Sequence, residues 1–170
     1  MDLSFEDLRA ADTGALTAWL TSEPWRFHGI RQTWTEADVL AAVADGEFTG
    51  ENRSFWVRAG DDRVGLLRFR YLDEVSPDLD VRVLERFRGR GIGSAMVDWA
   101  ATWVFTETER HRLGGETRID NVAMRRVFDR CGWTQEAHYR ASWPDGEGGW
   151  IDSIGYAILR DEWEARGSPT

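Results

Sequence analysis

A glycine-rich turn at residues 88–93 is the segment of this chain best suited to chemistry. Its sequence is Arg88-Gly89-Arg90-Gly91-Ile92-Gly93. Three glycines in five residues let the backbone approach a ligand closely, so successive amide N–H groups can converge on an anion. A helix is expected to begin here, adding unpaired N–H groups and the positive end of its dipole. The turn therefore predicts a phosphate site, with a tight strand-to-helix connection as the alternative.

The arginines around the turn narrow the class of ligand. Arg86, Arg88 and Arg90 form a dense positive cluster in a chain of formal net charge -9, which suggests a polyanion, because guanidinium groups bind phosphate in two-pronged fashion. A dinucleotide fold expects Gly-x-Gly-x-x-Gly after its first strand, whereas Ser94 and Ala95 follow Gly93 and at least three candidate strands precede the turn. All 21 basic side chains are arginine, so a P-loop and Schiff-base chemistry are excluded.

Composition excludes further classes of protein. The three histidines are far apart, without zinc-ligand spacing, and Cys131 has no second cysteine to pair with. The acidic charge opposes nucleic-acid binding and slightly favours a cationic substrate. No apolar run approaches the roughly 20 residues of a membrane helix, and the start of the chain does not resemble a signal peptide. We therefore expect a cytoplasmic protein that binds neither nucleic acid nor membrane.

The turn must be held by the elements on either side of it. Apolar periodicity predicts one α/β (α+β) domain over 1–170, with its core at about 2–163. Asp12 is expected to cap the first helix and Thr35 the second. The alternation of residues 78–84 predicts a strand with one face in water. The expected strands are 2–9, 54–59, 63–72, 78–84, 111–118, 133–141 and 151–159, and the expected helices follow Asp12, run from Thr35 to near Gly46, and cover 92–108 and 121–131.

With these motifs in place, the chain resembles the GNAT acetyltransferases. The turn matches their R/Q-x-x-G-x-G/A signature, and the helix from Asn121 ends in Cys131-Gly132-Trp133, similar to their Asn-to-Gly-Phe segment. Residues 8–12 and 150–156 resemble the ribosomal-protein alanine N-acetyltransferase (RimJ/RimL-like) branch. The resemblance implies a mixed central sheet of about six to seven strands, splayed between its two middle strands, with helices on both faces.

The same resemblance implies a reaction and a cofactor site. It implies transfer of acetyl from acetyl-CoA, with no metal, to a primary amine of a peptide N-terminus or a small cationic compound by direct attack in a ternary complex. A backbone N–H near Val83 would stabilise the negative charge that develops on the thioester oxygen. The residues it assigns to the cofactor are Val81, Val83, Arg88, Gly89, Arg90, Gly91, Ile92, Gly93, Ser94 and Asn121.

The chain departs from the family where proton transfer is concerned. Phe128 and Met124 occupy positions at which relatives carry a tyrosine or a serine, and neither can donate a proton. The candidate bases are Asp78, Asp80, Glu116 and Glu74, and the candidate acids are Tyr139 and Ser142. A non-catalytic acyl-CoA-binding or sensing module of the same fold therefore remains an alternative, as does a protein-interaction domain.

Aromatic residues in two loops are expected to border the acceptor groove. They are Trp25, Phe27, His28, Trp143 and Trp150, although any single tryptophan could instead pack in the core and His28 could be solvated. The expected partners are acetyl-CoA, an amine acceptor and a second copy of the chain in a homodimer.

Overall fold

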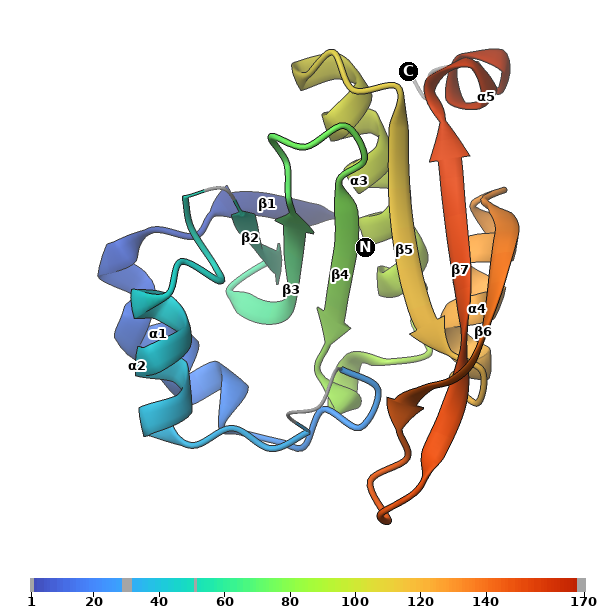
Figure 1. Cartoon of the computed structure of the whole chain (residues 1–170). Helices are drawn as coiled ribbons and strands as arrows, with labels where there is room; N and C mark the ends of the chain where they lie inside the picture. The colour runs from blue at the N-terminus through green and yellow to red at the C-terminus, as the bar shows by residue number, and fades with distance from the viewer. Residues whose placement is uncertain (1, 29–31, 51, 168–170) are drawn as a thin grey trace.

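The strand-forming segments pair into one seven-stranded mixed sheet in the order β1-β2-β3-β4-β5-β7-β6 (Figure 1). This computed structural model describes residues 2–28, 32–50 and 52–167. The strands are β1 (Leu3–Asp7), β2 (Arg53–Ala59), β3 (Asp62–Arg70), β4 (Asp78–Val83), β5 (Arg112–Arg118), β6 (Thr134–Pro144) and β7 (Trp150–Leu159). The helices are α1 (Thr13–Leu20), α2 (Glu36–Ala44), α3 (Ile92–Glu107), α4 (Val122–Arg130) and α5 (Arg160–Ala165). The α+β class and the strand number expected from the sequence are confirmed.

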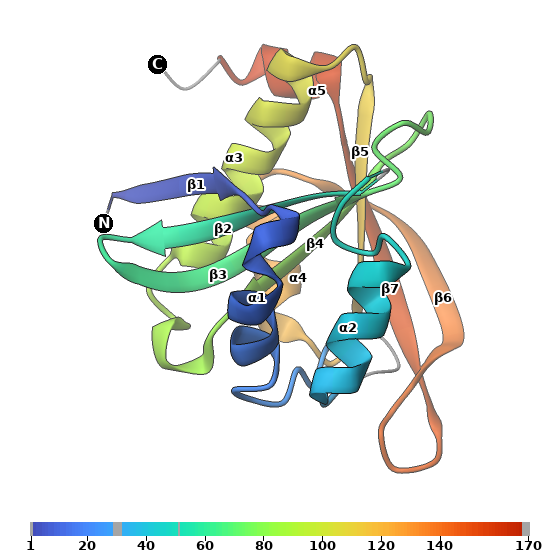
Figure 2. The same ribbon diagram turned by 90° about the vertical axis from the view of Figure 1, so that its left-hand side faces the viewer.

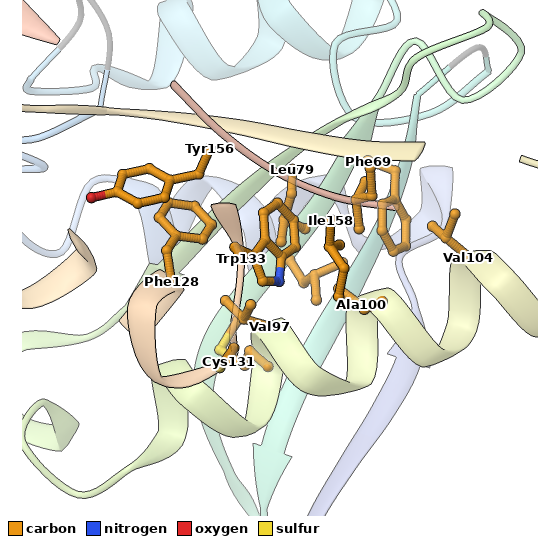
Figure 3. Packing of buried hydrophobic residues seen from close by; sticks show 14 of the residues in the cluster. Phe69, Leu79, Val97, Ala100, Val104, Phe128, Cys131, Trp133, Tyr156 and Ile158 are labelled. Carbon is orange, nitrogen blue, oxygen red and sulfur yellow. The ribbon is translucent and has the colours of Figure 1, made fainter. Parts of the chain in front are cut away.

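Helices cover both faces of the sheet, as Figure 2 shows, and each face has its own apolar core. Successive side chains of a strand point to opposite faces, so Phe55 packs with α3 while Trp56 packs with α1 and α2. On the α3 and α4 face, Phe128 stacks on Tyr156 with ring centroids 4.8 Å apart and contacts Trp133 (Figure 3). Phe128 is thus a packing residue, as its apolar character suggested.

Local capping explains where most helices begin and end. Thr35 Oγ1 accepts a hydrogen bond from the Asp38 N–H and caps α2, while Asn121 Oδ1 accepts one from the Met124 N–H and caps α4. Gly132 follows α4 with a φ of 61°, a left-handed conformation that favours glycine. The prediction that the Asp12 side chain caps α1 is wrong, because its carboxylate accepts from the Arg9 N–H instead. The short helix α5 was not predicted.

The two middle strands, β4 and β5, diverge. They pair in parallel only at Asp78 and Gly114, whereas six residue pairs join β3 to β4 and seven join β5 to β7. The expected splay is confirmed, and it leaves the later residues of β4 without a neighbouring strand on one side.

One expectation for β4 is wrong: its polar face is not in water. Arg82 is only 4% exposed, and the Asp80 side chain is largely buried. The reason is the register with β3, which sets Arg68 opposite Asp80 and Arg70 opposite Asp78. The charges pair across the strands, and aromatic residues cover them. In the described part of the chain, no helix is long and apolar enough to cross a membrane.

Candidate functional site

The glycine-rich turn connects β4 to α3 and presents its backbone to open space. Gly89 and Gly91 have φ values of 75° and 83°, and a Cβ built on either would meet nothing within 4 Å. Gly91 is the N-cap of α3, and no side chain in the described part of the chain caps this helix. The first helical hydrogen bond runs from the Ala95 N–H to the Gly91 carbonyl, so the N–H groups of residues 92–94 have no partner within the helix. Bare donors at a helix N-terminus suit an anion such as phosphate.

These donors line a cavity of about 410 Å³ between the turn and α4. Arg88 lines it too, anchored through Nε to the Val83 carbonyl and through Nη2 to Glu23. Arg90 does not line the cavity, because its guanidinium lies over the Phe87 ring. The expected cofactor residues on the cavity wall are Val81, Val83, Arg88, Gly89, Gly91, Ile92, Gly93, Ser94 and Asn121.

Three further arginines of this cavity were not predicted from the sequence. They are Arg26, Arg126 and Arg130. Arg126 and Arg130 are four residues apart on α4, which places them on one helix face. Their spacing was a usable signal, but only the packing of α4 beside the turn shows that they face the same cavity.

The free side of β4 offers backbone groups to the splay. The Leu84 N–H donates to the Val64 carbonyl in β3, so by alternation the backbone groups of Val81 and Val83 point the other way, toward β5. The Val81 carbonyl accepts from His28 Nε2 and the Val83 carbonyl from Arg88 Nε. Because β5 pairs with β4 only at Asp78, the Val81 and Val83 N–H groups face the splay without a strand partner among the described residues.

A second cavity, of about 520 Å³, adjoins the first. Five residues line both cavities, so the two meet at the splay: Phe27, His28, Val81, Asn121 and Met124. The lining of the second cavity includes the apolar side chains of Phe128, Trp143 and Leu79 and charged residues of β3, β4 and β5. A ligand in each cavity could therefore touch the other.

His28, at the junction, is not the solvated loop residue that the sequence allowed. Its side chain is 19% exposed. Nε2 lies 2.9 Å from the Val81 carbonyl, an acceptor only, so Nε2 carries the proton and Nδ1 has a lone pair. Burial, followed by the charge of Arg82, lowers the pKa of His28 to about 4. Nδ1 is buried and has no hydrogen-bond partner among the described residues, so neutral His28 presents an unused acceptor.

Glu116, a candidate base on β5, lines the second cavity. Its Oε1 accepts from Trp143 Nε1 at 2.7 Å and from Ser153 Oγ at 2.5 Å. Ser142 Oγ lies 2.6 Å from Ser153 Oγ, so the candidate acid Ser142 reaches Glu116 through one hydroxyl. The structure thereby connects two predicted residues that are far apart in the sequence.

The other candidate bases have different surroundings. Asp80 lines the second cavity, where burial raises its pKa but the charges of Arg82 and Arg68 outweigh burial and hold it below its usual value. Asp78 pairs with Arg70 and lines a smaller cavity; burial raises its pKa, and Arg70 opposes that effect. Glu74 is an exposed loop residue.

The remaining predicted residues divide between the cavity and other places. Phe27, His28 and Trp143 line the second cavity. Trp25 does not, because it is buried in the core under α1, where Nε1 donates to the Leu20 carbonyl. Trp150 is 68% exposed and lines neither cavity. Tyr139 lines the smaller cavity with Asp78.

Within the residues that the structure describes, no group of three or more histidine, cysteine, aspartate or glutamate side chains is arranged to hold a metal ion.

Known proteins share both the sequence pattern and the architecture. A family model described as an acetyltransferase (GNAT) domain matches residues 2–134. The uncharacterized N-acetyltransferase YnaD of Bacillus subtilis is 21% identical over 153 residues, covering 81% of this chain and 89% of YnaD. The putative ribosomal N-acetyltransferase YdaF of the same organism is 29% identical over 105 residues, covering 59% of this chain and 55% of YdaF. The solved structure of spermidine N-acetyltransferase from Vibrio cholerae, in complex with CoA and spermine, matches with a TM-score of 0.80 at 15% identity, covering 95% of this chain and 98% of that one.

Proposed function

Since the chain belongs to the GNAT family of acetyl-CoA-dependent N-acetyltransferases, we propose that it transfers the acetyl group of acetyl-CoA to a primary amine by direct attack in a ternary complex. One observation carries the proposal: a cavity walled by bare helix-start amides meets a second cavity holding an acidic residue, and the two join at the β4–β5 splay. The first accepts the cofactor and the second the amine.

On the cofactor side, the protein binds and orients. The N–H groups of residues 92–94 and the guanidinium groups of Arg88, Arg126 and Arg130 hold the diphosphate. The Val81 and Val83 N–H groups pair with the pantetheine arm, and one of them faces the thioester oxygen. Acetyl-CoA, when bound, supplies an activated acyl group, so no covalent enzyme nucleophile is required.

On the acceptor side, Glu116 takes the proton that the attacking amine loses. It lines this cavity and accepts hydrogen bonds from Trp143 and Ser153, whereas Asp80 is paired with Arg68 and Arg82. Both of its hydrogen bonds among the described residues use Oε1, so they orient the carboxylate and leave Oε2 to face an amine.

The test measures free thiol released from acetyl-CoA in the presence of a panel of peptides and small amines, with titration calorimetry of acetyl-CoA alongside. We expect micromolar to submillimolar cofactor binding and amine-dependent thiol release. Tight binding without release across the panel would instead favour the non-catalytic module, which the loss of proton donors at Phe128 and Met124 motivates. Absence of binding at millimolar acetyl-CoA would exclude both.

Two finer proposals follow the resemblance to the RimJ/RimL-like branch. The resemblance implies a peptide N-terminus or a small amine as acceptor, and mass spectrometry of a reacted library of peptides and amines decides between them. The chain forms a homodimer, which sedimentation equilibrium detects as twice the monomer mass.

A further inference from the structure

Three arginines lie on one wall of the acceptor cavity. Arg68 and Arg70 come from β3 and Arg82 from the neighbouring strand β4, and all three line the 520 Å³ cavity. The nearby carboxylates are already engaged: Asp78 pairs with Arg70, Asp80 with Arg68 and Arg82, and Glu47 with Arg68. The cavity lining therefore includes three guanidinium groups from one face of β3 and β4.

Arg82 is the least satisfied of the three. Its guanidinium lies between two indole rings, 5.6 Å from the centroid of Trp25 and 5.7 Å from that of Trp34. Its one hydrogen bond among the described residues is a long contact of 3.4 Å from Nη2 to Asp80 Oδ2. Nε and Nη1 are buried and have no partner there, although the side chain is only 5% exposed.

Buried donors without a hydrogen-bond partner are rare in proteins. Leaving a buried charged group unpaired costs more free energy than a formed hydrogen bond contributes to stability. Arg68 Nε and Arg70 Nε are unpartnered and buried as well. Asp80 cannot serve them all, since its carboxylate is shared between Arg68, Arg82 and the His28 ring. A carboxylate or another oxyanion is the group that an unpaired guanidinium N–H binds best.

We infer that Arg82 marks an anion subsite within the acceptor cavity, and that the acceptor is a small amine that also carries a carboxylate. This inference rests on the proposed function of the cavity and specifies its substrate class. The amine lies toward Glu116 and the cofactor junction, and the carboxylate lies toward Arg82. The apolar wall, which includes Phe128 and Trp143, contacts the carbon skeleton between or beside them.

The subsite argues against a polyamine as the preferred acceptor. A second ammonium group placed on the arginine wall would meet like charges at close range in a poorly solvated cavity, which disfavours binding. A neutral peptide N-terminus would leave the Arg82 donors unpartnered. An amine that also carries a carboxylate can place its amine near Glu116 and pair its carboxylate with Arg82.

The experiment compares matched pairs of acceptors by thiol release. Each pair is an amino acid and the amine left when its carboxylate is removed, such as phenylalanine and phenethylamine or lysine and 1,5-diaminopentane. We expect kcat/KM to be at least about tenfold higher for the carboxylate member of the preferred pair. In Arg82→Met, we expect the KM for the amino acid of that pair to rise by about tenfold or more. The KM for the amine without the carboxylate should change by no more than about twofold.

Further measurements separate loss of the subsite from loss of folding or of turnover. Calorimetry of acetyl-CoA shows whether Arg82→Met is folded, and Arg82→Lys, which keeps the charge but loses the planar fork, is expected to have an intermediate KM. Binding of the amine-free carboxylate, such as 3-phenylpropanoate, to the wild-type protein and its absence for the corresponding amide test the subsite without turnover.

Preference for diamines or neutral peptides, or an equal loss for both members in Arg82→Met, would overturn the inference while leaving the transferase proposal intact. If no amine is acetylated, the transferase proposal fails, and carboxylate binding to wild type but not to Arg82→Met still decides whether the subsite exists.

Discussion

Glu116 is held by two donors on one oxygen, and this asymmetry makes it the best-oriented proton acceptor of the acceptor cavity. Replacing it by glutamine keeps the size and one carbonyl oxygen but removes the basic site. We expect Glu116→Gln to lower kcat by about 10²- to 10⁴-fold, the usual contribution of general acid–base catalysis. Steady-state kinetics should show little change in KM for acetyl-CoA, because Glu116 does not line the cofactor cavity.

The matched control is Glu136→Gln on the exposed strand β6, where the carboxylate pairs with Arg112 outside both large cavities. Its kcat should stay within about twofold of wild type, since exposed ion pairs contribute little. If Glu116→Gln retained wild-type kcat across pH 6 to 9, Glu116 would not be the base, and the neutral ring of His28 would be tested next.

His28 gives the protein a specific pH dependence. Its pKa falls from 6.5 to about 4 on folding. Between about pH 6.5 and pH 4, His28 is therefore protonated in the unfolded chain but neutral in the folded chain. Stability is therefore full above this window and is lost as the pH decreases through it, by about 2 kcal/mol at pH 5.

Urea unfolding of wild type and His28→Gln at pH 5, 6, 7 and 8 checks this effect. The difference in unfolding free energy between the two proteins should change in favour of the variant as the pH decreases. A difference that stays constant between pH 8 and pH 5 would show that His28 is not buried in the neutral form.

Residue identities on their own concealed these roles. His28 lies in a loop, where solvation was the natural alternative, and its burial depends on contact with Val81, 53 positions away in the sequence. Likewise, Glu116 could be placed on a strand from the sequence, but its links to Trp143 and Ser153 required the β5–β7 and β6–β7 registers.

At the scale of elements, the divergence of β4 from β5 leaves amides without a strand partner among the described residues. The Val81 and Val83 N–H groups should exchange with solvent rapidly in the free protein and slowly when acetyl-CoA is bound. Hydrogen exchange by mass spectrometry should show at least about tenfold slower exchange in peptides covering 79–84. Peptides covering β2, which is paired on both sides, should not change.

Protection confined to the glycine-rich turn, without any change over 79–84, would contradict the place proposed for the pantetheine arm. The phosphate site would then stand, but the splay would have another use.

Most elements were predictable because their signals are local. The apolar period of α3, the Thr35 cap of α2 and the Gly132 stop of α4 all lie within a few residues of the feature they specify. The burial of the polar face of β4 was not predictable from the sequence. Strand alternation shows which residues share a face but not what covers that face. Asp80 is buried where β3 places Arg68 across from it, and Arg82 is buried between the rings of Trp25 and Trp34.

At the scale of the whole molecule, the sheet separates two cores and brings the two halves of the site together at one edge of β4. The turn was identified from the sequence because six consecutive residues contain it. Arg126 and Arg130 were not, because they reach the cofactor cavity only when α4 packs beside α3. The sequence thus indicated the part of the site that one continuous segment forms. The parts that come from several elements, such as Arg126 and Arg130, required the fold.

Because the cofactor cavity is formed by α3, α4 and the turn together, cofactor binding should stabilise the whole domain. At 100 times its dissociation constant, acetyl-CoA adds about 2.7 kcal/mol to the free energy of unfolding. For a chain of this size that corresponds to a rise in Tm of roughly 5 to 10 °C. Differential scanning fluorimetry with and without acetyl-CoA measures this shift.

Gly93→Leu should abolish the shift without unfolding the protein. Gly93 lines the cofactor cavity, and a Cβ there would make only ordinary contact with Val127 at 3.7 Å, so the larger side chain fills the space meant for the ligand. Gly14→Leu is the matched control, because Gly14 is exposed on α1 and a Cβ there meets nothing within 4 Å. A full acetyl-CoA shift in Gly93→Leu would mean that the ligand binds elsewhere, and the assignment of both cavities would then fail, since the acceptor cavity was defined by its junction with this one.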